Sequence, residues 1–256
     1  KKMPRNKKTK NASKKKKKRL EKTNPSNLLF FFPGYPNTPG IWTEAQIEAW
    51  RPVTSAVKKA AAAAAPATFF CQLWATGRVS ARAYQPDGRP PPSASATKFE
   101  GEGGVTLPDF TTVPYETARA LEVAEIEQLV GQYGTAARNA IAAGFDGVEC
   151  HLANGYLPEQ FMRRSSNKRE DAYGAAPGFE SRARFALEVV KAAVEGAGGA
   201  ERVGVRLSPF GQFLMSSIDE DAVEFYVYLV KGEFLSSYLE ERGNRGRRKP
   251  PTNTVF

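Results

Sequence analysis

The chain has 256 residues, which is enough for one large α/β domain or for one or two ordinary domains. Its formal net charge of +10 is concentrated at one end, because residues 1–22 carry thirteen Lys or Arg and one acid, a net of +12. The remainder therefore carries a net of about −2, which argues against a nucleic-acid-binding body. The sequence also shows no stretch long and apolar enough to span a membrane and no secretory or organelle signal.

Residues 1–27 are predicted to form a disordered basic tail, since they are rich in charge and poor in apolar residues. The run Lys14–Arg19 is compatible with a nuclear localisation signal or a nucleic-acid-binding arm, but a solvated extension is the favoured interpretation. A second basic, disordered stub is predicted at residues 241–256. We therefore expect a cytoplasmic protein, with the nucleus as the alternative.

The first predicted helix follows the turn-rich segment Pro33–Gly40. Thr43 is expected to be its N-cap, because Gln46 three residues later completes a capping box. The helix is expected to end near Ala64 and to bury an apolar face made of Ile47, Trp50, Val53 and Val57.

A short apolar run, Thr68–Trp74, predicts a buried strand. It is followed by a Pro-, Gly- and Ser-rich stretch, Gly77–Pro114, whose length is typical of a functional loop. The next helix is expected over Leu121–Ala143, with Gly144 ending it. Its predicted apolar face consists of Ile126, Leu129, Val130, Ala137 and Ile141.

The remaining predicted elements alternate between strands and helices: strand Phe145–His151, helix Phe179–Val194, strand Val203–Leu207 and helix Asp219–Leu239. This alternation predicts an α/β fold with a parallel sheet covered by helices. Cys71 and Cys150 lie inside apolar runs, so we expect reduced, buried thiols and no metal site.

Polar side chains follow the predicted strands, which is where a β/α barrel places its chemistry. His151, the only histidine, is followed by Asn154 and Tyr156. A histidine and a carboxamide offer donors to a carbonyl oxygen, and a phenol offers a proton. The alternative is that His151 is a satisfied core residue and that Tyr156 is a packing aromatic with a solvated hydroxyl.

Several separate blocks occur in an order that one protein family shares: Gly34–Thr43, Phe69–Trp74, Gly77–Ser80, Tyr84–Gly88, Ala136–Ile141, Gly144–Glu149, His151–Leu157 and Val203–Phe210. Through these blocks the chain resembles the Old Yellow Enzyme family of FMN-dependent NADPH ene-reductases, in particular the plant-type 12-oxophytodienoate reductases. The resemblance extends roughly from Gly34 to Val230.

The resemblance implies a (β/α)8 TIM barrel that is truncated at both ends in this chain. Residues 28–240 are expected to form an incomplete flavin oxidoreductase domain with about three to four of the eight βα units. In the family, the segment that holds the FMN phosphate lies downstream of the part resembled here. We therefore expect the 256-residue chain to bind FMN weakly.

The resemblance also implies a role for each candidate residue. Gln72 would hydrogen-bond the flavin ring, and Arg206 would place a positive charge beside its pyrimidine side. His151 and Asn154 would hold the carbonyl oxygen of a small-molecule enone or enal. The reduced flavin would give a hydride to the β-carbon, and Tyr156 would protonate the α-carbon, with NADPH or NADH as the reductant.

Two hypotheses follow from this resemblance. In the first, the chain is an FMN-dependent NAD(P)H oxidoreductase that reduces the C=C bond of α,β-unsaturated carbonyl compounds. In the second, it is a catalytically inactive fragment of the family's barrel. A third and weaker hypothesis, a nucleic-acid-associated protein, rests on the basic tail alone.

Overall fold

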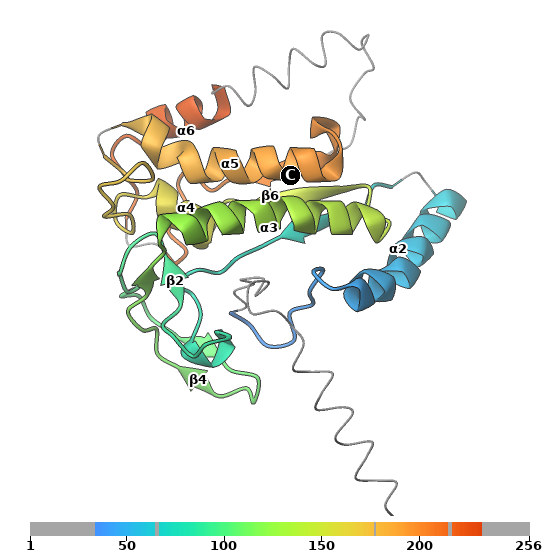
Figure 1. Cartoon of the computed structure of the whole chain (residues 1–256), viewed down its shortest axis with the longest axis horizontal. Coiled ribbons are helices and arrows are strands. Elements are labelled where there is room, and N and C mark those ends of the chain that lie inside the picture. The colour runs from blue at the N-terminus through green and yellow to red at the C-terminus, as the bar shows by residue number, and fades with distance from the viewer. Residues whose placement is uncertain (1–33, 65–66, 177, 215–216, 232–256) are drawn as a thin grey trace, which may run out of the picture. The chain divides into compact units, whose positions relative to one another are not determined.

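The computed structural model describes residues 34–64, 67–176, 178–214 and 217–231 (Figure 1). Both predicted tails, residues 1–27 and 241–256, lie outside these ranges, and so does the end of the predicted last helix after Lys231. The domain boundaries predicted from the sequence therefore stay predictions.

The central feature of the described residues is a three-stranded parallel sheet in the order β1-β6-β7. Its strands are β1 (Phe70–Leu73), β6 (Gly147–His151) and β7 (Val203–Arg206), all within segments predicted as strands. Helices α3 (Val123–Ala142) and α5 (Phe179–Ala197) run along the sheet and pack against each other (Figure 1). This arrangement confirms the predicted α/β class, whereas the number of βα units stays a prediction.

The two long helices approach closely because glycines stand where they cross. A Cβ atom on Gly196 of α5 would lie 2.0 Å from the carbonyl oxygen of Gly134 on α3, so only glycine fits there. The helices end differently: α3 is followed by Gly144 with a φ of +94°, as predicted, and α5 runs past Val194 to Gly198 with a φ of +80°.

The first described helix, α2 (Glu44–Ala64), begins with the predicted capping box. The Gln46 amide donates to the Thr43 hydroxyl at 3.2 Å, and the Thr43 amide donates to the Gln46 side chain at 3.0 Å. The prediction that Val53 is buried is wrong, since its exposure is 44%. Thr54 is buried instead, because the inward side of α2 meets the end of α3, where the Thr54 hydroxyl donates to the Ala143 carbonyl at 2.7 Å.

The long stretch after β1 is more ordered than its composition predicts. It contains the 3-10 helix η2 (Arg82–Tyr84) and the short antiparallel pair β3 (Val105–Thr106) and β4 (Thr112–Val113). Its other short strand, β2 (Pro92–Ser93), pairs in parallel with β5 (Arg119–Ala120) just before α3. Backbone pairing rather than apolar periodicity orders this segment, so sequence pattern gave little sign of it.

Three further elements complete the described residues: α4 (Leu157–Met162), the 3-10 helix η3 (Ala200–Arg202) and α6 (Ala222–Lys231). The short helix α4 is fully buried and directly follows the segment His151–Tyr156. Among the helices of residues 34–231 that are described, none has the length and apolar character to cross a membrane.

The two faces of the sheet differ in what covers them. Val148 and Cys150 of β6 have no exposed surface and lie on the helix side. On the opposite face, Phe70 is 39% exposed, and Gln72 and Arg206 are also exposed. The prediction that Thr68–Trp74 forms a buried strand is therefore wrong, because the described residues cover only one side of β1.

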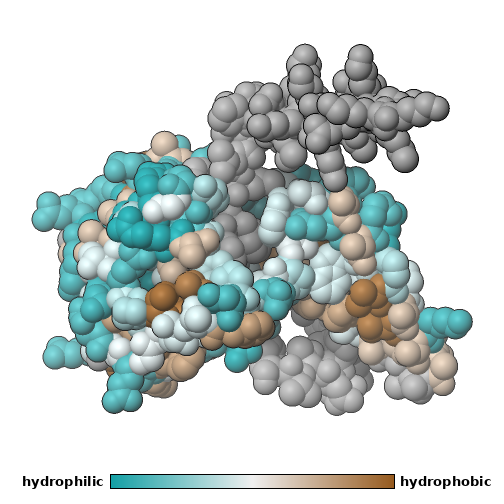
Figure 2. Space-filling view, turned by 90° about the horizontal axis from the view of Figure 1, so that it is seen from below, coloured by the Kyte–Doolittle hydropathy of each residue, from teal (hydrophilic) through white to brown (hydrophobic). Residues whose placement is uncertain are grey.

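One face of the molecule carries small, separate apolar areas. On the face seen in Figure 2, hydrophilic residues predominate and strongly hydrophobic residues form isolated patches. Scattered apolar side chains of this kind are normal on protein surfaces and do not by themselves indicate an interface.

Candidate functional site

The carboxyl ends of β1 and β6 bring three aromatic rings together. Trp74 follows β1, His151 ends β6, and Tyr156 lies in the turn before α4. The Tyr156 ring centroid lies 4.9 Å from that of Trp74 and 5.1 Å from that of His151, and Trp74 stacks on His151 at 6.4 Å. The structure therefore places two of the three predicted catalytic side chains in one cluster.

His151 is held as a neutral donor. Its side chain is almost fully buried, and its Nδ1 atom accepts a hydrogen bond from the Ala153 amide at 3.3 Å. Burial, reinforced by the positive charge of Arg206, lowers the pKa of His151 to about 4. At neutral pH the ring is uncharged, and because Nδ1 is an acceptor, the proton is on Nε2. His151 can therefore donate a hydrogen bond through Nε2.

Asn154, which lies between His151 and Tyr156 in the sequence, has an unusual backbone conformation. Its φ is +59°, and the next residue, Gly155, has a φ of +75°. The Asn154 backbone amide donates to the Ser208 hydroxyl at 2.9 Å. Its half-buried side-chain amide has no hydrogen bond to another described residue. The structure thus places Asn154 in the loop between His151 and Tyr156, with a carboxamide that is available to a ligand.

Tyr156 keeps its proton at neutral pH. Its side chain is 7% exposed, and its hydroxyl shares a hydrogen bond of 3.0 Å with the hydroxyl of Tyr35. Burial and this contact both raise the pKa of Tyr156 above its ordinary value. Tyr35 was not among the predicted site residues, although it lies in one of the family-like blocks, Gly34–Thr43. Only the fold shows that Tyr35 and Tyr156, which are 121 positions apart, are hydrogen-bonded to each other.

The two residues predicted to bind a cofactor lie on the open face of the same sheet. Gln72 is in register with Glu149, and its amide donates to that carboxylate at 2.5 Å. Arg206 is in register with His151. The structure shows no ion pair for Arg206 within the residues that it describes. Glu149 is a further polar residue of this face that sequence reasoning did not select.

The open face has room at Gly204. Gly204 lies in register with Glu149, in the same row as Gln72, and a Cβ atom there would meet nothing closer than 3.9 Å. The row therefore has free space beside an amide and a guanidinium, which are the groups that bind the polar edge of a flavin. This donor set is compatible with an FMN ring next to the rings of His151 and Tyr156.

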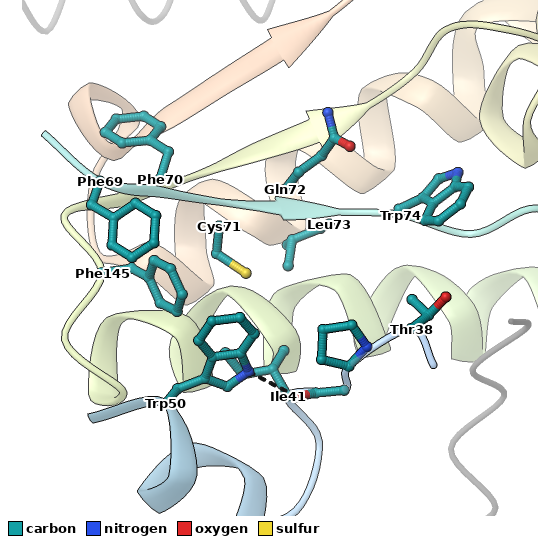
Figure 3. A pocket seen from close by; sticks show the side chains of 12 residues that line it. Thr38, Ile41, Trp50, Phe69, Phe70, Cys71, Gln72, Leu73, Trp74 and Phe145 are labelled. Atoms are coloured by element: carbon teal, nitrogen blue, oxygen red, sulfur yellow. Dashed lines mark hydrogen bonds between the residues drawn. The ribbon is translucent and has the colours of Figure 1, made fainter. Parts of the chain in front are cut away.

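A mainly apolar hollow lies beside β1, and its lining also includes Gln72 and Trp74. It has a volume of about 440 Å³, and its side chains include Ile41, Trp50, Phe69, Cys71, Leu73 and Phe145 (Figure 3). Figure 3 shows Cys71 pointing toward these apolar residues and Gln72 pointing away from them. Burial raises the pKa of the Cys71 thiol to about 11, so this thiol is not reactive at neutral pH.

Sequence comparisons identify the family of this chain. A profile of the NADH:flavin oxidoreductase / NADH oxidase family matches residues 32–235. The rice (Oryza sativa subsp. japonica) putative 12-oxophytodienoate reductase 5 is 48% identical over 212 residues, which make up 83% of this chain and 50% of that protein. Rice 12-oxophytodienoate reductase 1 is 46% identical over 198 residues, 77% of this chain and 48% of that protein. The chain thus spans about half the length of these relatives.

Solved structures agree as well. An Old Yellow Enzyme homologue from Zymomonas mobilis superimposes with a TM-score of 0.70 at 38% identity, covering 80% of this chain and 54% of that one. Morphinone reductase in complex with tetrahydroNAD gives a TM-score of 0.67 at 46% identity, covering 76% of this chain and 53% of that one. The chain therefore belongs to the NADH:flavin oxidoreductase / NADH oxidase family, with the Old Yellow Enzyme homologues and the 12-oxophytodienoate reductases, as the sequence blocks predicted.

Proposed function

We propose that this chain is an FMN-dependent NAD(P)H oxidoreductase that reduces the C=C bond of α,β-unsaturated ketones and aldehydes. The observation that carries the proposal is the contact between a neutral, buried histidine and a protonated, buried tyrosine. His151 and Tyr156 meet with their ring centroids 5.1 Å apart at the carboxyl edge of the sheet. This pair combines a hydrogen-bond donor for a carbonyl oxygen with a proton source for the adjacent carbon.

Gln72 and Arg206 would hold the flavin ring on the open sheet face, Gln72 through hydrogen bonds and Arg206 through its charge. When bound, FMN supplies the hydride that a side chain cannot provide. Membership of the flavin oxidoreductase family supports this assignment. A similar solved structure, morphinone reductase, contains tetrahydroNAD, which supports a nicotinamide as the reductant class.

The protein's own groups would polarise the substrate. His151 Nε2 and the Asn154 side chain would donate to the carbonyl oxygen, drawing electrons away from the conjugated double bond. Tyr156 would then deliver its proton to the α-carbon. The shared hydrogen bond with Tyr35 gives Tyr156 a neighbour from which its proton can be replaced. Trp74 packs edge-on against Tyr156 and would shield the phenol from solvent on that side.

The proposal is tested by loading the full chain with FMN and following NADPH- and NADH-dependent reduction of 2-cyclohexen-1-one. Tyr156→Phe is expected to slow enone reduction by about 10² to 10⁴, because it removes a general acid. Bleaching of the flavin absorbance by the nicotinamide is expected to be unchanged, since that step needs no phenol.

Tyr173→Phe is the matched control. Tyr173 is also buried, but its hydroxyl donates to Glu188 at 3.0 Å, outside the aromatic cluster. Its removal should leave turnover unchanged. Equal turnover in wild type and Tyr156→Phe would contradict the proposed role. A chain that takes up FMN but reduces no enone would instead support the inactive-fragment hypothesis.

A further inference from the structure

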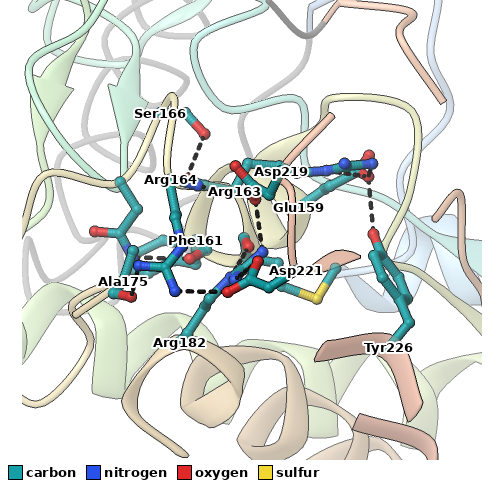
Figure 4. A network of polar contacts seen from close by, with 12 residues as sticks. Glu159, Phe161, Arg163, Arg164, Ser166, Ala175, Arg182, Asp219, Asp221 and Tyr226 are labelled. Carbon is teal, nitrogen blue, oxygen red and sulfur yellow. Dashed lines mark hydrogen bonds and ion pairs between the residues drawn. The ribbon is translucent and has the colours of Figure 1, made fainter. Parts of the chain in front are cut away.

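A buried carboxylate contacts the site loop, which is the segment between His151 and Tyr156. Glu159, on α4, has no exposed surface. It forms an ion pair with Arg163 one turn later, with an N···O distance of 2.6 Å, and accepts a hydrogen bond from the Tyr226 hydroxyl of α6 at 3.0 Å (Figure 4). Arg163 in turn donates to the Ser208 carbonyl at 2.7 Å. The carboxylate is therefore fixed from two helices and from the loop after β7.

This carboxylate is connected to the loop between His151 and Tyr156 in two ways, one direct and one through Ser208. The Gly155 amide donates directly to Glu159 Oε2 at 2.7 Å. The Ser208 hydroxyl donates to the same carboxylate at 3.0 Å and accepts the Asn154 amide at 2.9 Å. The consecutive backbone amides of Asn154 and Gly155 are thus both held by the Glu159 carboxylate, Gly155 directly and Asn154 through Ser208.

The loop needs such restraints because its backbone is strained. Asn154 adopts a left-handed conformation that side-chain-bearing residues rarely populate, and Gly155 follows with a second positive φ. A Cβ atom at Gly155 would lie 2.7 Å from both the Cβ and the carbonyl oxygen of Leu214, so the backbone is closely packed there. Such a conformation persists only where the surroundings determine it.

We propose that Glu159 is a positioning residue, which fixes the backbone of Asn154 and Gly155 and thereby sets the placement of the Asn154 and Tyr156 side chains toward a substrate. Its catalytic meaning rests on the proposed function, but its structural effect does not. Glu159 acts through the loop, since its hydrogen bonds go to Gly155, Ser208, Arg163 and Tyr226 rather than to either ring of the site.

The test uses two variants of the full chain. Glu159→Gln removes the negative charge that accepts hydrogen bonds from the Gly155 amide and the Ser208 hydroxyl. Ser208→Ala removes only the hydroxyl that links Asn154 to Glu159 and leaves the ion pair between Glu159 and Arg163 intact. This variant therefore remains informative if Glu159→Gln does not fold. Glu188→Gln is the control, because Glu188 also accepts a tyrosine hydroxyl but has no contact with the site loop.

The first measurement is amide hydrogen exchange at Asn154 and Gly155, with the amides of α5 as the internal reference. Glu159→Gln is expected to speed exchange at both amides by about tenfold or more relative to α5, because Gly155 loses a charge-assisted hydrogen bond and the Ser208 hydroxyl that holds Asn154 loses its charged acceptor. Ser208→Ala is expected to have this effect mainly at Asn154. The control should change neither amide.

The second measurement is the NMR titration of His151, which is unambiguous because the chain has one histidine. Its ring is faced by Arg206, Glu149 and Tyr156, none of which is altered in the variants. Loosening the loop admits water, so the His151 pKa should rise by about half a unit or more from its lowered value in Glu159→Gln. Unchanged exchange and an unchanged His151 titration in both variants would overturn the proposal.

Neither measurement needs bound flavin, so this inference and the proposed function can fail separately. Faster exchange in the variants of a chain that reduces no enone would retain the positioning role and reject the proposed function. Where the FMN-loaded wild type is active, Ser208→Ala is expected to lower kcat for enone reduction more than it raises KM. Unaltered exchange in an active enzyme would reject the positioning role alone.

Discussion

The two faces of the β1-β6-β7 sheet have opposite characters although they are built from the same strands. On the helix side, Val148 and Cys150 have no exposed surface. On the other side, Gln72 and Arg206 are exposed and Glu149 is half-buried. Because strand side chains alternate, each strand contributes one set of residues to the core and another to the candidate site. Stability and chemistry are therefore separable by substitution at neighbouring positions.

The largest expected effect comes from placing a charge on the helix side. Val148→Asp would bury an unpaired carboxylate between the sheet and the helices, at a cost of more than about 4 kcal/mol in the free energy of unfolding. Urea denaturation followed by circular dichroism measures this cost. A loss smaller than about 1 kcal/mol would show that the helix side is not a packed core.

The next effect belongs to His151, at the edge of the open face. Its pKa of about 4 in the folded state lies below its ordinary value of 6.5, so the unfolded chain binds more protons between these two pH values. With respect to His151, the free energy of unfolding is therefore at its full value above pH 6.5. It decreases as the pH falls toward 4, by up to about 3 kcal/mol.

Urea denaturation at a series of pH values, with His151→Gln for comparison, isolates this contribution from that of the carboxylates. The variant should lose less stability than the wild type between pH 6.5 and pH 4. Parallel pH profiles of the two proteins would mean that His151 titrates normally and is not held neutral by burial.

A smaller effect is expected where α2 meets α3 on the helix side. Thr54→Val keeps the shape of the side chain but leaves the Ala143 carbonyl without its buried donor, at a cost of about 1 to 2 kcal/mol in the free energy of unfolding. Thr135→Val is the matched control, since Thr135 donates only to Gly131 of its own helix. Equal denaturation midpoints for the two variants would contradict a role for Thr54 in attaching α2.

The smallest effect on stability is expected on the open face itself. Gln72→Ala removes an exposed side chain and its bond to Glu149, and should change the free energy of unfolding by less than about 0.5 kcal/mol. The same denaturation experiment measures this change. A loss comparable to that of Val148→Asp would mean that the open face is part of the core, and the contrast between the faces would disappear.

Local signals explain which parts of the structure were predictable. The capping box at Thr43, the end of α3 at Gly144 and the strand segments depend on neighbouring residues, and the structure confirms them. Val53 was wrongly predicted to be buried, because helical periodicity does not decide which of two adjacent residues faces the core. The contact with the end of α3 buries Thr54 instead.

Contacts between residues distant in sequence explain what was missed. Tyr35 is part of the site because it is hydrogen-bonded to Tyr156, 121 positions away. Glu149 is part of it because it accepts a hydrogen bond from Gln72, 77 positions away. No local pattern encodes such contacts. His151, Asn154 and Tyr156 could be selected because they are close in sequence, whereas Gln72 and Arg206 were selected through the family resemblance.

The central claim, that the open sheet face receives a flavin beside His151 and Tyr156, is tested most directly by titrating FMN fluorescence with the full chain. We expect saturable quenching with weak affinity, and a dissociation constant raised about tenfold in Arg206→Gln through loss of one charged contact. Cys71→Ser, on the far side of β1, should leave the affinity unchanged. Quenching that is equal in all three proteins, or absent in the wild type at millimolar FMN, would contradict the account.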